Sequence, residues 1–99
     1  MEKMLISCQI PVTFIEENDQ VTAHCPVLDI ATCGDDFDDA KKMFEDLMTI
    51  FFEELCNMGT LEDVLLENGF KKVENVPNKW IPPKIIGSIT ENIQVLCPA

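Results

Sequence analysis

The feature that most constrains the fold is a helical pattern in residues 37–58. Apolar residues recur there at spacings of three and four, which is typical of an amphipathic helix. Three further apolar side chains widen the apolar arc to roughly 200°, about twice what packing on one surface requires. We therefore expect the C-terminal tail or a second subunit to cover these three side chains, which are the candidate oligomer or partner interface: Met43, Ile50 and Phe52.

The segment before this helix supplies the surface that the helix covers. Within residues 5–16 the even positions from 6 to 14 are apolar, the period-two pattern of a half-buried strand. A polar break at Asn18 and Asp19 predicts a hairpin that places Phe14 opposite Ala23. With a third strand ending near residue 33, we expect an α+β fold: a three-stranded antiparallel meander within residues 4–33, followed by the long amphipathic helix.

The second half of the chain is less regular. Gly59 is placed to end the long helix as a left-handed residue, and a short helix is predicted over residues 61–68. Residues 70–84 contain three prolines and no periodicity, so we expect an irregular connection anchored by Trp80. Residues 88–97 alternate again and predict a final strand, paired within or between subunits. All 99 residues are expected to form a single domain.

Four aspartates stand within five positions at the predicted start of the long helix. As the N-cap, Asp36 can accept a hydrogen bond from the Asp39 amide, while Asp38 and Asp39 lie in the first turn, where the helix dipole favours negative charge. The central glycine and alternating ligands of a calcium loop are missing. Magnesium needs only two carboxylates from different elements, so it stays an alternative at Asp35. We expect helix capping here, with no metal, cofactor or catalytic residue.

The charge balance points to a protein partner. The net charge is −11 and all seven basic residues are lysine, so the chain repels phosphate backbones and has no guanidinium group for reading bases. Direct binding of nucleic acid by this chain is therefore not expected. The same charge attracts a basic protein. Residues 35–67 hold eleven acidic residues against Lys41 and Lys42, so the helical side contributes most of this field.

The histidine and the cysteines favour structural roles. His24 is expected opposite Thr13 on the wetter face of the sheet, as an ordinary surface histidine. The five cysteines are odd in number and widely separated, with no Cys-x-x-Cys pair, which favours reduced thiols in a cytosol. The apolar runs are too short for a signal peptide or for a span of about 20 residues. We therefore expect a cytoplasmic protein that does not enter a membrane.

Residues 14–59 carry an ordered series of motifs: a strand, a polar turn, a second strand, a Pro-x-Leu pair, a Thr-x-Gly-Asp stretch, and a long helix ending near glycine. The residues that carry it are Pro26, Leu28, Thr32, Gly34, Asp35 and Ala40. This order resembles the HicB-like antitoxin family, whose signature is Thr-x-Gly-Asp-Thr-x-Glu-Glu-Ala. Here Asp36 stands at the capping threonine, and Asp38 and Asp39 replace the glutamate pair. The family's Pro-Gly after the leucine is missing from this chain.

The resemblance implies a partial RNase H-like fold in a homo-oligomer that neutralises a small basic HicA-like toxin, an mRNA-cleaving ribonuclease, by binding it. Many members also carry a C-terminal DNA-binding module, and the residues after Gly69 show no pattern for one. Our leading hypothesis is a non-enzymatic HicB-like antitoxin or a solitary relative. The alternatives are a divalent-metal-dependent RNase H-like nuclease using Asp35, Asp36 and other carboxylates, and an orphan oligomeric protein without a toxin.

Overall fold

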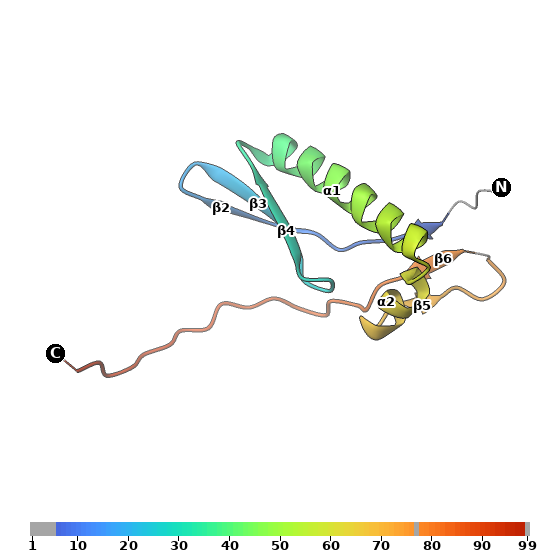
Figure 1. Cartoon of the computed structure of the whole chain (residues 1–99). Coiled ribbons are helices and arrows are strands. Elements are labelled where there is room, and N and C mark those ends of the chain that lie inside the picture. Colours follow the sequence, from blue (N-terminus) through green and yellow to red (C-terminus); the bar gives the residue numbers. More distant parts are fainter. Residues whose placement is uncertain (1–5, 77, 99) are drawn as a thin grey trace.

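The computed structural model describes residues 6–76 and 78–98. Its elements in chain order are β1 (Ser7–Cys8), β2 (Thr13–Glu17), β3 (Gln20–Cys25), β4 (Ile30–Gly34), α1 (Phe37–Met58), α2 (Leu61–Glu67), β5 (Lys71–Lys72) and β6 (Lys79–Ile81). One sheet has the order β2-β3-β4, and a second has the order β1-β6-β5. The helix α1 packs on β3 and β4 of the first sheet (Figure 1). The predicted α+β class, with an antiparallel meander and a long helix, is confirmed.

The meander forms in the register that its apolar pattern predicts. Phe14 lies opposite Ala23, and Ala23 lies opposite Thr32 on β4. Asn18 and Asp19 make the tight turn between β2 and β3, with φ angles of 49° and 64°. Asparagine and aspartate adopt this left-handed backbone more readily than other side chains, and two-residue hairpins require it. The turn therefore fixes the register, which in turn places the apolar side chains of the meander toward α1.

The predicted first strand is divided in two. β1 pairs in parallel with β6 of the second sheet, whereas β2 pairs with β3 of the first. The main-chain pairing of β1 reaches as far as Gln9, whose N–H donates to the Trp80 carbonyl at 3.4 Å. Pro11 follows, and proline has no N–H to donate to a ladder. The alternating pattern of residues 5–16 is thus interrupted by proline, and its two halves serve two different sheets.

Both helices begin and end close to the predicted positions. α1 begins after Asp36, and Gly59 ends it with a φ of 72°, the left-handed conformation that glycine adopts most easily. α2 occupies most of the predicted 61–68 segment. In the described part of the chain, no helix is both long and apolar enough to cross a membrane.

The predicted irregular connection contains two short strands, which corrects the expectation for residues 70–84. β5 and β6 pair antiparallel, and Val73 N–H donates to the Lys79 carbonyl at 2.9 Å. Strands of two and three residues are too short to show periodicity, and they form because β1 offers β6 an edge. Trp80 lies on β6 with only 3% of its surface exposed, so the anchoring role expected for it is confirmed.

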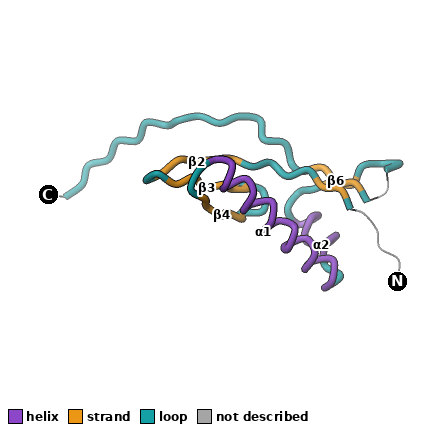
Figure 2. Tube along the Cα trace, turned by 90° about the horizontal axis from the view of Figure 1, so that it is seen from above, coloured by secondary structure: helices purple, strands orange, loops and turns teal. Residues whose placement is uncertain are grey.

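The predicted final strand does not form within the single chain. Residues 82–98 contain neither helix nor strand, and residues 84–98 are exposed throughout. A strand needs a neighbouring edge for its hydrogen bonds, and the views in Figures 1 and 2 show this segment running clear of both sheets. The segment also lengthens the molecule, which measures 64 × 28 × 22 Å. We call residues 84–98 the arm.

The core has two adjoining clusters along α1. The first lies between α1 and the meander, and the second lies between the end of α1, α2 and β6. Half-buried residues shared by the two clusters join them, including Ile10, Phe51 and Phe52. Burying an aliphatic or phenyl side chain contributes about 1.5–3 kcal/mol, so these clusters hold the elements together. Their buried members are Ala23, Cys25, Ala40, Phe44, Met48, Leu55, Leu61, Leu65, Phe70 and Trp80.

Candidate interaction surface

The outward face of α1 is acidic and open to solvent. All of the acidic side chains of the helix are exposed: Asp38, Asp39, Glu45, Asp46, Glu53 and Glu54. Lys41 Nζ contacts Glu45 Oε1 at 2.9 Å, one turn along the helix, and the glutamate raises the pKa of this ammonium. The pair neutralises one carboxylate and leaves the excess of negative charge in place. Such a surface attracts a basic partner over several ångströms, and the attraction weakens with salt.

The apolar flank of α1 is only partly covered. Met43 is 47% exposed and Ile50 is 63% exposed, so the chain itself does not bury them. Phe52 is half-buried and packs against both core clusters, with its ring in edge contact with Phe51 at 5.5 Å between centroids. Of the three side chains predicted to need a cover, Met43 and Ile50 therefore remain available to a partner, and Phe52 already contributes to the core.

The signature residues meet at the junction of β4 and α1. Asp39 N–H donates to Asp36 Oδ1 at 2.8 Å, as predicted for an N-cap. The carboxylate of Asp39 turns back and accepts from the Asp35 N–H at 2.8 Å through its Oδ2. These two bonds satisfy main-chain donors on both sides of Asp36; they differ from a capping box in that the returning carboxylate accepts from the residue before the N-cap. Asp35 thus has a local role through its main chain, which the spacing of residues alone did not predict.

Gly34 lets the helix begin directly above the sheet. A Cβ atom at this position would stand 2.5 Å from the Ala40 main-chain nitrogen and 2.8 Å from its Cα. Because both are main-chain atoms, no rotation of a side chain could relieve such a contact. Glycine at position 34 is therefore required by close packing of the first turn of α1 on β4, and Ala40 is fully buried at this contact.

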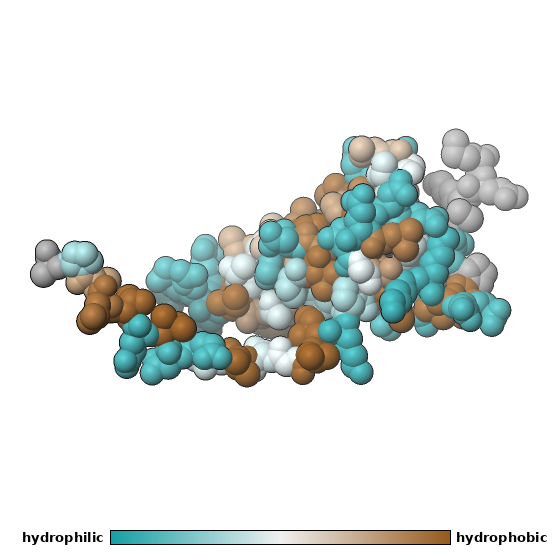
Figure 3. All heavy atoms as spheres, turned by 90° about the horizontal axis from the view of Figure 1, so that it is seen from below, coloured by the Kyte–Doolittle hydropathy of each residue, from teal (hydrophilic) through white to brown (hydrophobic). Residues whose placement is uncertain are grey.

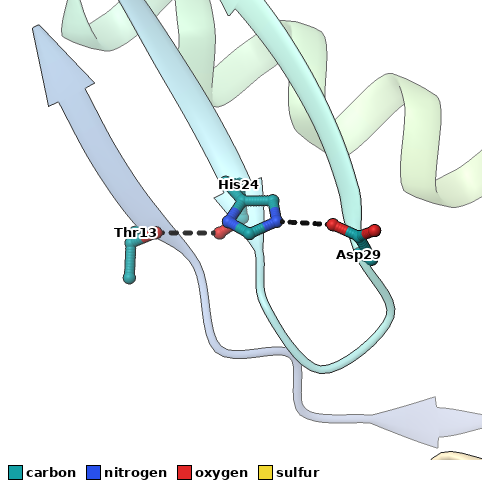
Figure 4. A network of polar contacts seen from close by, with 3 residues as sticks. All are labelled: Thr13, His24 and Asp29. Carbon is teal, nitrogen blue, oxygen red and sulfur yellow. Dashed lines mark hydrogen bonds and ion pairs between the residues drawn. The ribbon is translucent and has the colours of Figure 1, made fainter. Parts of the chain in front are cut away.

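His24 belongs to a small polar network on the side of the β2-β3-β4 sheet that faces away from α1 (Figure 4). Its Nε2 lies 3.1 Å from Asp29 Oδ1, and Thr13 Oγ1 donates to the His24 carbonyl at 3.2 Å. Thr13 is also the residue opposite His24 in the sheet, as predicted. The Asp29 side chain is almost fully exposed, and its backbone is left-handed with a φ of 54°. The network ties the β3–β4 turn to the sheet and shows no nucleophile aligned with the histidine.

The described residues do not gather ligands for a metal ion. Among them, no cluster of three or more histidine, cysteine, aspartate or glutamate side chains has a metal-binding arrangement. All five cysteines are free thiols. Burial raises the pKa of the Cys8 thiol to about 11, with a smaller contribution from Cys25. A thiol of this kind is a poor nucleophile at neutral pH.

The arm is the feature whose exposure the sequence did not predict. Its large aliphatic residues stand away from the core, as the brown spheres along it in Figure 3 show. The alternation in residues 88–97 was the available signal, and it predicted a strand without naming the edge that accepts it. The exposed residues of the arm include Ile85, Ile86, Ile89, Ile93, Val95 and Leu96.

Comparisons with known proteins add no relative: no family model, no curated protein and no solved structure matches this chain.

Proposed function

We propose that this chain is a non-enzymatic interaction protein of the cytoplasm, a HicB-like antitoxin or a solitary relative. In this proposal it binds a small basic HicA-like toxin and keeps that ribonuclease from its mRNA substrate. The observation that carries the proposal is the exposed acidic face of α1, with its bare apolar flank at Met43 and Ile50. The acidic face steers a basic partner toward α1, and the partner gains binding energy by covering the apolar flank.

The position of the signature supports the same proposal. Residues 32–40 span the junction between β4 and α1, where Asp36 accepts from the Asp39 N–H and the Asp39 carboxylate accepts from the Asp35 N–H. In the family that the sequence resembles, the signature likewise precedes the long helix. A partial RNase H-like arrangement is part of the proposal, supported by the order of a hairpin, a third strand and a long helix.

Co-expression with the small basic protein encoded beside this chain tests the proposal. The two are expected to co-purify, and the chain is expected to relieve growth arrest by its partner. A sharper experiment compares two double variants for binding of the toxin. One carries Asp46→Lys with Glu53→Lys on α1, and the other carries Glu16→Lys with Glu17→Lys in the hairpin. Both pairs change the net charge equally, so the control matches long-range steering.

The α1 pair is expected to weaken binding at least tenfold, which corresponds to about 1.4 kcal/mol, while the hairpin pair leaves affinity within a few-fold. Equal losses for both pairs would mean that only net charge matters. If the unmodified chain does not bind the small basic protein encoded beside it, the antitoxin proposal is rejected.

Self-association is the other part of the proposal. A homo-oligomer would cover the flank of α1 that the chain leaves bare. Ile50→Glu is expected to shift the sedimenting species toward monomer with the fold intact, because Ile50 is 63% exposed. Phe52→Glu is expected to destabilise the fold itself, because Phe52 packs against both core clusters. An unchanged mass for Ile50→Glu would remove Ile50 from the interface.

A further inference from the structure

The arm has the composition of a buried strand and the environment of a solvated one. Ile86 is 93% exposed, Ile93 is 77% exposed and Val95 is 74% exposed. Figure 3 shows apolar residues at intervals along this extended segment. Large aliphatic side chains exposed in this number on one segment mark an interaction site.

The start of the arm is held in place by a pair of prolines. Pro82 and Pro83 precede the arm and are half-buried, and a Cβ added to Gly69 would stand 3.0 Å from Pro83 Cγ. Proline fixes φ near −65°, so this pair forms a stiff connection packed against the end of α2. A short, stiff connection of this kind hinders folding back and favours exchange of a segment between copies.

The first sheet ends in the open edge of β4, and the bare apolar flank of α1 lies on the side of the helix turned away from β2. In α1, Phe37 reaches β2, where its ring lies 4.3 Å from that of Phe14, whereas Ala40 lies against Gly34 of β4. Each step of three residues turns a helix back by about 60°, so Met43 lies one further step round the helix from Phe37 and Ala40. The exposed flank of α1 is therefore turned away from the contact of Phe37 with β2.

The arm and this edge are complementary in length and pattern. Residues 93–97 alternate, with Ile93, Val95 and Cys97 on one side, and this stretch has five residues, as β4 has. Neither stretch contains a charged side chain. Edges that natural proteins protect from pairing usually carry charges, bulges or proline, and β4 has none of these within Ile30–Gly34.

Charge favours the same pairing. Residues 84–98 contain one lysine and one glutamate and are neutral, so the net charge of −11 resides in the rest of the chain. Two such bodies repel each other wherever they meet directly, whereas a neutral arm adds no repulsion. At about 3.3 Å per residue the extended arm reaches about 50 Å, enough to cross the short dimensions of a second body.

We propose that the arm of one copy of this chain adds as a strand to the open β4 edge of a second copy, and that the exchange is reciprocal. Ile93, Val95 and Cys97 then lie under the flank formed by Met43 and Ile50. The partner is thus a second copy of the chain. This inference rests on the self-association part of the proposed function and needs no toxin. A dimer that survives loss of the arm contacts would reject the exchange and leave self-association standing.

Analytical ultracentrifugation of the full chain, purified alone, tests the exchange. The unmodified protein is expected to sediment as a dimer, at twice the 11.2 kDa of one chain. Ile93→Asp with Val95→Asp is expected to give a monomer that keeps the helical circular dichroism signal, because both side chains are exposed in the single chain. The matched control is Asn92→Asp with Gln94→Asp, which adds the same charge to the opposite side of the arm and is expected to remain dimeric.

A monomeric unmodified chain, or a dimer that survives Ile93→Asp with Val95→Asp, would overturn the proposal. If the control variant, Asn92→Asp with Gln94→Asp, is also monomeric, added charge alone disrupts the dimer. That result would also reject the prediction that Ile93 and Val95 form the buried side of the arm.

Crosslinking tests which edge receives the arm. Cys33 is exposed on the side of β4 that faces away from α1, and Leu96 follows the opposite parity to Val95 in the arm. With Cys97→Ser as background, Gln94→Cys or Leu96→Cys is expected to form a disulfide to Cys33 between chains on mild oxidation. Cys33→Ser is expected to abolish the covalent dimer. If neither position links to Cys33, or if the bond closes within one chain, the β4 edge is not the acceptor.

Discussion

The contact between β4 and the start of α1 gives the sharpest test of the fold. In Gly34→Ala, the added Cβ would stand 2.5 Å from the Ala40 nitrogen and 2.8 Å from the Asp39 carbonyl carbon. Ordinary contact begins at 3.4 Å, so the helix start and the strand must separate by about 0.9 Å. Both partners are main chain, and Ala40 is fully buried, so the separation loosens the packing of α1 on the sheet.

The expected cost follows from two opposing effects. Overpacking a close-packed site typically costs about 1–3 kcal/mol. Replacing glycine by alanine also restricts the unfolded chain, which returns about 0.4–1 kcal/mol. We expect the free energy of unfolding to fall by about 2 kcal/mol, because main-chain atoms can yield only by moving the whole turn. For a domain of this size, that loss lowers the Tm by about 8–16 °C.

Two other glycines serve as matched controls for the same substitution. Gly87→Ala lies in the arm with no atom within 4 Å of the new Cβ, so its effect is expected within about 0.5 kcal/mol. Gly59→Ala also meets no atom, but its φ of +72° is left-handed, and that conformation costs alanine about 1–2 kcal/mol. The series thus separates steric contact from backbone strain.

Urea unfolding at fixed protein concentration measures all three variants. Circular dichroism follows α1, and the fluorescence of Trp80 follows the second core cluster, since Trp80 is only 3% exposed. If Gly34→Ala is as stable as Gly87→Ala, α1 does not approach β4 as closely as the structure has it, and the steric reason for glycine in the signature is wrong.

Three further predictions concern the cap, the core and a thiol. Asp36→Ala is expected to cost about 1 kcal/mol in thermal unfolding, and Asp38→Ala, which removes an equal charge but no cap bond, is expected to cost less. Phe70→Ala should cost about 3–5 kcal/mol, because Phe70 is 1% exposed, and a loss below 1 kcal/mol would contradict its burial. Cys8, with its pKa raised to about 11, should react with iodoacetamide far more slowly at pH 8 than the exposed Cys33. The reaction rate of Cys8 should keep rising up to about pH 11, as more of its thiol ionises. Equal rates for the two cysteines at pH 8 would contradict the burial of Cys8.

Local patterns predicted the elements whose stability is local. The cap at Asp36, the left-handed Gly59 and the turn at Asn18 and Asp19 each depend on residues within a few positions of one another, and the structure contains all three. The hairpin register followed for the same reason, because a two-residue turn and an alternating pattern admit one pairing that keeps apolar side chains on one face. The long helix followed from its apolar period.

The site was predicted in part. The sequence located the acidic helix face and the excess apolar residues, but periodicity cannot say which of those residues the core takes. Packing placed Phe52 between the two clusters and left Ile50 in solvent. The bond from Asp35 N–H to the Asp39 carboxylate was likewise missed, because it depends on the angle at which the strand enters the helix.

The sequence by itself determined the amphipathic helix, its caps, the meander and the strongly acidic surface, since each of these follows from neighbouring residues or from composition. Only the tertiary structure decided which strands share a sheet. The parallel pairing of β1 with β6 joins residues about seventy positions apart, and no short-range pattern encodes such a contact. The same holds for residues 88–97: alternation made them suitable for a strand, but a strand needs an edge, and the fold of one chain left them without it.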